Sequence, residues 1–150
     1  MRVALASDHG GYLLKEELKA ALTEWGYSIV DVGCDSSASV DYVDYAEKAV
    51  EAVLNGDCER AILICGTGIG MSIAANKYPG IRAALCHDQF SAQATREHND
   101  SNVLCLGARV IGFGLAQSIV KVWLNTEFVG GRHQRRIDKI TSIEKRFCRQ

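Results

Sequence analysis

A cysteine between an apolar run and a glycine-rich loop is the most chemically suggestive residue of this sequence. Residues 61–64 read Ala-Ile-Leu-Ile, Cys65 follows, and glycines stand at positions 66, 68 and 70. This pattern predicts a buried strand, a tight loop and the start of a helix. Backbone N–H groups in such a loop can hold an anion, and they favour the thiolate form of a nearby cysteine. We therefore expect Cys65 to act as a base and the loop to stabilise negative charge.

The loop matches neither of the two common nucleotide-binding motifs. No Gly-Lys-Ser/Thr closes it, so it is not a Walker loop, and its glycines do not have the GxGxxG spacing. An unpaired cysteine is most often a buried structural residue, and that alternative stays open for Cys65. Its position at the end of a strand favours the catalytic interpretation.

Polar residues follow the first predicted strand and end a later predicted helix. Asp8-His9-Gly10-Gly11 follows an apolar run, so Asp8 and His9 either face a substrate or form a turn in which Asp8 caps a helix. His98-Asn99-Asp100 ends a helical pattern, where a histidine is more often only a partner of the helix dipole. The residues alone leave both alternatives open.

Two arginines near the C-terminus are spaced for one helix face. Arg132 and Arg136 stand four residues apart, which suits the recognition of a phosphate group. A basic stretch of this kind is usually a solvated surface, and the sequence alone favours neither interpretation.

Five apolar runs alternate with segments of helical periodicity, too far apart for hairpins, which predicts a parallel sheet with helices on both faces. Ligands bind at the carboxyl ends of such strands, where Asp8-His9, residues 65–70 and Arg109 are expected. The expected strands are 3–6, 28–32, 61–64, 82–86 and 102–106; the expected helices are 13–25, 41–54 capped by Asp41, one ending near Lys77, one through 92–97, one around 115–123, and 132–149.

The composition is that of an ordinary globular protein. The 150 residues are 47% hydrophobic and 23% charged, which favours one domain over 1–150 with its own core. The net charge of −1 makes no general case for nucleic acid or an anionic membrane, and no apolar run approaches the ~20 residues of a membrane span. Six cysteines lack CxxC spacing, and no signal peptide is recognisable, so we expect reduced thiols, no zinc site and a cytoplasmic location.

Five motifs together resemble the ribose-5-phosphate isomerase B family. The wider family also contains galactose-6-phosphate isomerase subunits and allose-6-phosphate isomerases. The resemblance covers essentially the whole chain, and the cysteine motif is its most specific part. The motifs are Ser7–Gly11, Cys65–Lys77, Gly80–Ala83, Arg96–Asn99 and Gly130–His133.

The resemblance implies a Rossmann-like, three-layer α/β/α fold with a five-stranded parallel sheet and a basic C-terminal helix. It implies an aldose-ketose isomerase of the non-oxidative pentose phosphate pathway that needs no metal or nucleotide cofactor. The family is a homodimer or a dimer of dimers, with each site at the subunit boundary. The implied catalytic residues are Cys65 as the base, His98 in ring opening and Thr67 at the enediolate; the implied substrate-binding residues are Asp8, His9, Gly66, Thr67, Gly68, Ile69, Gly70, Asn99, Arg109, Arg132 and Arg136.

Two other functions are compatible with the sequence. An isomerase of a six-carbon sugar phosphate, such as allose 6-phosphate or galactose 6-phosphate, would need only a slightly longer pocket. A phosphosugar-binding sensor would keep the fold without the chemistry, although Cys65, Thr67 and His98 argue against it. One departure from the family is Val43, where members often have proline after Asp-Tyr; we expect a local effect only.

Overall fold

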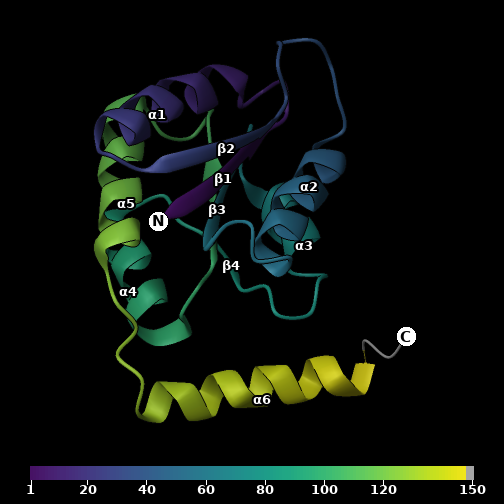
Figure 1. The fold of residues 1–150 in the computed structure, drawn as a ribbon, viewed down its shortest axis with the longest axis vertical. Coiled ribbons are helices and arrows are strands. Elements are labelled where there is room, and N and C mark those ends of the chain that lie inside the picture. The colour runs from purple at the N-terminus through teal and green to yellow at the C-terminus, as the bar shows by residue number, and fades with distance from the viewer. Residues whose placement is uncertain (148–150) are drawn as a thin grey trace.

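A computed structural model describes residues 1–147, which form five parallel strands and six helices (Figure 1). The last helix was expected to end at Arg149, which lies outside the described residues, as does the sixth cysteine, Cys148. The strands are β1 (Arg2–Ser7), β2 (Ser28–Gly33), β3 (Arg60–Cys65), β4 (Ala83–Leu85) and β5 (Val103–Gly107); the helices are α1 (Tyr12–Glu24), α2 (Tyr42–Leu54), α3 (Ile69–Ala75), α4 (Gln89–Asn99), α5 (Phe113–Asn125) and α6 (Arg132–Phe147).

The order of the strands creates a crevice at the place where Cys65 was expected. The sheet runs β2-β1-β3-β5-β4. From β1 the chain moves outward to β2, and then crosses back to place β3 on the other side of β1. Ligands of open parallel sheets bind at such a reversal of direction, beyond the carboxyl ends of the two central strands. Here those ends are Ser7, paired in register with Ile64, and the adjoining Cys65.

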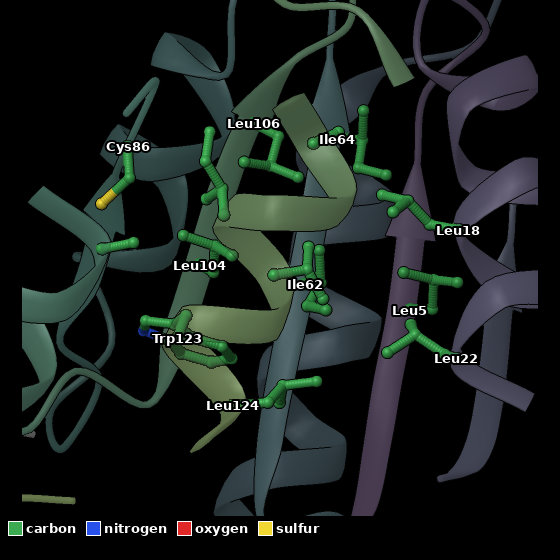
Figure 2. Packing of buried hydrophobic residues seen from close by; sticks show 14 of the residues in the cluster. Leu5, Leu18, Leu22, Ile62, Ile64, Cys86, Leu104, Leu106, Trp123 and Leu124 are labelled. Carbon is green, nitrogen blue, oxygen red and sulfur yellow. The ribbon is translucent and has the colours of Figure 1, made fainter. Parts of the chain in front are cut away.

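Two apolar layers bury both faces of the sheet, which confirms the predicted α/β/α fold. Ile62 and Ile64 of β3 face α1 and α5, and Leu63 and Cys65 face α2 and α3. Figure 2 shows the first layer, where side chains of β1, β3 and β5 point toward α1 and toward Trp123 of α5. Since a strand alternates its side chains, the same regularity that buries Leu63 turns Cys65 toward the loop above α3.

Helix α6 packs little against the sheet. In Figure 1 it lies across one end of the molecule, and only His133 and Ile137 of its residues are buried. Two of its apolar side chains, Ile143 and Phe147, are 50% and 77% exposed. A groove of about 610 Å³ separates this helix from Arg82, Asn99 and the start of β4. An apolar helix face that stays exposed favours contact with a second protein chain.

Several expected helix ends differ from the structure. Asp41 precedes α2, but its side chain makes no capping hydrogen bond. Asp8 does not cap α1 either, because its Oδ1 already accepts the N–H of Gly11 (3.1 Å) and closes the turn between β1 and α1. Helix α3 ends at Ala75 and not near Lys77, since the Asn76 side chain pairs with both backbone groups of Ala83 (2.9 Å each) and thereby extends the sheet edge.

The remaining predictions concern the cysteines, membrane-spanning helices and metal sites. The five cysteines in residues 1–147 are all unpaired, as expected. No helix in that part of the chain is long and apolar enough to cross a bilayer. Within it, no cluster of three His, Cys, Asp or Glu side chains is arranged to hold a metal ion.

Candidate active site

Cys65 is the last residue of β3, and its sulfur receives a backbone hydrogen bond. The Gly68 N–H donates to Sγ at 3.1 Å, and the side chain is only 5% exposed. Gly68 reaches this position with φ +76, and a Cβ there would lie 2.5 Å from the Leu85 side chain. Glycine is therefore required at 68 for the loop to turn its amide onto the sulfur. The loop thus places a backbone N–H donor directly on the Cys65 sulfur.

The two cysteines nearest in the sheet lack this arrangement. Burial raises the pKa of Cys86 to about 11, and burial raises the pKa of Cys105 on β5 far above its usual range. Both stay protonated at neutral pH. Among the cysteines in residues 1–147, Cys65 is thus the one whose sulfur accepts a backbone N–H. This favours the catalytic interpretation of Cys65 over that of a buried structural residue.

The glycine loop is held against the segment that follows β5. The Arg109 N–H donates to the Gly66 carbonyl (2.9 Å), and the Arg109 side chain lies along Gly66, where a Cβ would be 3.4 Å from its Cδ. The Thr67 hydroxyl accepts the N–H of Ile69 (3.3 Å) and is exposed. Arg109, Thr67 and Cys65 therefore border the same space at the carboxyl edge of the sheet.

The turn after β1 closes this space from the other side. A Cβ on Gly10 would lie 3.3 Å from Asp8 Oδ1 and 3.5 Å from the Gly66 nitrogen, so the two loops are in contact. Asp8 is buried, and His9 Nδ1 accepts the N–H of Val40 (3.2 Å). That bond leaves Nε2 as the free edge of the His9 ring. The structure thus brings together Asp8, His9, Cys65 to Gly70 and Arg109, as the strand pattern predicted.

His98 and Asn99 lie at the opposite side of the sheet from Cys65, near the amino ends of the strands. They end α4, which returns from the carboxyl end of β4 to the start of β5. The Asn99 carbonyl accepts a hydrogen bond from Arg82 Nε (2.8 Å), and Arg82 stands just before β4. Cys65 pairs with Gly107 at the far end of β5, four residues beyond Val103. At ~3.3 Å per residue, more than about 13 Å separates the two groups within one chain.

The two C-terminal arginines accompany His98 and not Cys65. Arg132 and Arg136 are exposed in the first turns of α6. His133, between them, stacks on His98 with ring centroids 4.3 Å apart and planes inclined by 13°. The expected site residues therefore form two groups in one chain. One lies at the carboxyl ends of the strands, and the other lies near their amino ends.

Tyr42 is a neighbour of the glycine loop that the sequence interpretation missed. Its ring covers Gly70, where a Cβ would lie 2.7 Å from two ring carbons. The Tyr42 side chain is partly exposed, so it forms an edge of the space above the loop. The Asp-Tyr motif at the start of α2 could have pointed to this residue. It suggested only a local effect, because α2 and α3 are distant in sequence.

The contact between His133 and His98 makes stability depend on pH. Burial, followed by the charges of His98, Arg132 and Arg136, lowers the pKa of His133 below its usual 6.5. The folded state therefore favours neutral His133, and as pH falls below about 6.5 the unfolded chain binds a proton that the folded chain does not. We expect the free energy of unfolding to fall more steeply between pH 6.5 and 5 in the wild type than in His133→Phe, whose ring keeps the stack without titrating. Parallel pH profiles in urea unfolding would contradict this.

Known proteins resemble this chain over nearly its full length. Residues 3–140 match the family described as Ribose/Galactose Isomerase. Escherichia coli ribose-5-phosphate isomerase B is 50% identical over 145 residues, covering 97% of each chain. The D-erythrulose-4-phosphate isomerase of Pectobacterium atrosepticum is 42% identical, covering 96% of this chain and 95% of its own. The structure of Clostridium thermocellum ribose-5-phosphate isomerase B superposes with a TM-score of 0.97 at 53% identity, covering 98% of this chain and 99% of that one.

Proposed function

Because this chain belongs to the ribose/galactose isomerase family, we propose that it is an isomerase that interconverts D-ribose 5-phosphate and D-ribulose 5-phosphate. The observation that carries this proposal is the Gly68 amide on the Cys65 sulfur, at the crevice between β1 and β3. Relatives of five-carbon specificity at 50% and 53% identity favour this substrate over a six-carbon sugar phosphate.

The chemistry that we assign to Cys65 is proton transfer between two neighbouring carbons. The thiolate removes the proton from C2 of the open-chain aldose, and the electron pair moves onto the carbonyl oxygen at C1. The enediolate formed carries negative charge on oxygen, and the N–H groups of the loop at 66–70 with the Thr67 hydroxyl stabilise it. The proton of the C2 hydroxyl passes to O1, and the thiol returns its proton to C1, which gives the ketose with its carbonyl at C2. The isomerisation therefore needs no oxidant or reductant.

Ring opening and phosphate binding need the residues at the other edge. Ribose 5-phosphate is mostly cyclic, so His98 takes the proton of the C1 hydroxyl and passes it to the ring oxygen as the bond between C1 and that oxygen breaks, and Asn99 holds a sugar hydroxyl. Arg132 and Arg136, with His9 from the first group, bind the phosphate, and Arg109 is a further contact to the ligand. A phosphate remote from the reacting carbons supplies binding energy that orients them against Cys65. Asp8 contacts the sugar near its ring oxygen.

We infer that a second copy of the chain unites the two groups. In this arrangement the partner subunit's His98, Asn99, Arg132 and Arg136 complete the site around Cys65, and the symmetric exchange forms a second site. The distance between the two sheet edges supports this, because one chain cannot bring both groups to one sugar. The exposed apolar residues of α6 support it as well, since a homodimer would bury them. A dimer of dimers is compatible with the same sites.

A substrate panel tests the proposed reaction. Purified protein in EDTA is assayed with four-, five- and six-carbon aldose phosphates, and kcat/KM is compared. We expect ribose 5-phosphate to have the highest kcat/KM, and turnover to persist without metal. No turnover of any member, with binding retained, would instead favour the sensor function. A preference for allose 6-phosphate would assign a six-carbon substrate.

We also infer that residues 1–150 form one domain and that the enzyme works in the cytoplasm. One sheet carries both apolar layers, and no boundary interrupts residues 1–147, which supports the first inference. The five unpaired thiols in that range support a reducing compartment.

A further inference from the structure

The backbone around His98 and Asn99 is held by two arginine side chains. Arg82 donates from Nε to the Asn99 carbonyl (2.8 Å) and from Nη2 to the Asp100 carbonyl (2.9 Å). Arg96 donates from Nη1 to the Ser101 carbonyl (2.7 Å). Three successive carbonyls at the end of α4, which have no partner within a helix, are thus satisfied by guanidinium groups. Such fork-shaped donors fix orientation better than a lysine could.

Asp100 shows how strongly this turn is constrained. It adopts φ 45 and ψ 48, the left-handed conformation that favours glycine or asparagine. A non-glycine residue persists there when its surroundings over-determine it. Its carboxylate is bracketed by the same two arginines, at 2.8 Å from Arg96 Nη1 and 3.4 Å from Arg82 Nη2. The two arginines therefore hold both the backbone and the side chain of the turn.

The side chains just before this turn point outward, free for a ligand. The His98 side chain is 47% exposed, and its ring is supported by the His133 stack. The Asn99 side chain lines the groove beside α6 and makes no hydrogen bond within residues 1–147. A rigid backbone carrying two polar side chains that make no hydrogen bond within residues 1–147 is the arrangement that preorganised sites require.

We propose that Arg82 is a positioning residue for ring opening: by holding the carbonyls of Asn99 and Asp100, it sets the orientation of His98 and Asn99 toward the sugar. This rests on the proposed function, in which His98 opens the ring. Arg82 holds the turn through Nε and Nη2, and we assign it no contact with the sugar. Arg96 acts in the same way, but it is almost fully buried, so Arg82 is the residue to test.

Two measurements separate ring opening from the proton transfer at Cys65. Isomerisation of ribose 5-phosphate requires both steps. Ribulose 5-phosphate is open-chain, because the hydroxyl that could close its ring carries the phosphate. In D2O, Cys65 removes a C1 proton from this ketose to give the enediolate, the thiol exchanges with solvent, and a deuteron returns to C1. Deuterium incorporation, followed by NMR, therefore reports Cys65 without ring opening.

Arg82→Met keeps the aliphatic stem and removes the donors. We expect it to lower kcat for ribose 5-phosphate by about 10- to 100-fold, because a small misplacement of a catalytic group is costly. Deuterium exchange into ribulose 5-phosphate should change by less than about threefold. Arg82→Lys, which can reach one carbonyl, should recover part of the lost kcat.

Arg60→Met is the matched control. Arg60 donates to the carbonyls of Trp123 and Leu124 at the end of α5, so its loss removes similar contacts that do not include the backbone of His98 or Asn99. It should lower Tm and leave the ratio of isomerisation to exchange unchanged. The proposal is overturned if Arg82→Met lowers both activities in parallel or lowers neither. Wild-type protein that neither isomerises nor exchanges would instead refute the proposed function.

Discussion

Replacement of Cys65 by alanine is expected to lower kcat/KM for ribose 5-phosphate by about 100-fold at least and about 10⁴-fold at most, the range that a general base contributes. No other described thiol accepts an amide N–H, so none can take over the proton transfer. Cys65→Ser should be equally inactive, because a hydroxyl in the same place is too weak a base. Initial rates of ketose formation measure the loss.

Binding and a neighbouring thiol supply the controls for Cys65. Calorimetry should show that Cys65→Ala still binds ribose 5-phosphate, since the phosphate contacts are separate from the base. Cys105→Ala removes a thiol on the adjacent strand, opposite Leu63, and should keep most of the turnover. If Cys65→Ala stays active, or if Cys105→Ala is the inactive variant, the base has been assigned wrongly.

Two inactive variants are expected to restore each other's activity when they form one dimer. Cys65→Ala keeps an intact His98 edge, and His98→Ala keeps an intact Cys65 edge. In a heterodimer, one site receives both defects and the other receives none. Co-expressed chains with different tags, purified through both tags, should therefore have about half of the wild-type turnover per dimer.

The homodimers and a same-edge pair are the controls for this experiment. Each variant alone should be nearly inactive, and a heterodimer of Cys65→Ala with Cys65→Ser should stay so. Sedimentation measures the mass of each species. A heterodimer of Cys65→Ala and His98→Ala without turnover would show that each site is built within one chain, contrary to our inference.

Much of the fold and half of the site could be predicted from local sequence. The apolar runs and helical periodicities place all five strands within two residues of their observed ends, because backbone pairing and burial act on short segments. The predicted side-chain cap at Asp41 was wrong, because the Asp44 N–H is bound by the backbone carbonyl of Asp41 instead. The contact of Tyr42 with Gly70 was missed because α2 and α3 meet only through tertiary packing.

The sequence by itself determined the surroundings of Cys65: an apolar strand must end there, and glycine at 68 lets a backbone amide turn back to the sulfur. The tertiary structure alone decided where the other functional residues lie. Asp8 meets Cys65 because β1 and β3 are neighbours in the sheet. His98 lies at the opposite edge because α4 must return the chain to the start of a parallel strand. That geometric requirement separates Cys65, the base that we propose, from His98, the ring-opening residue that we propose, and it is the physical reason for the second subunit in our proposal.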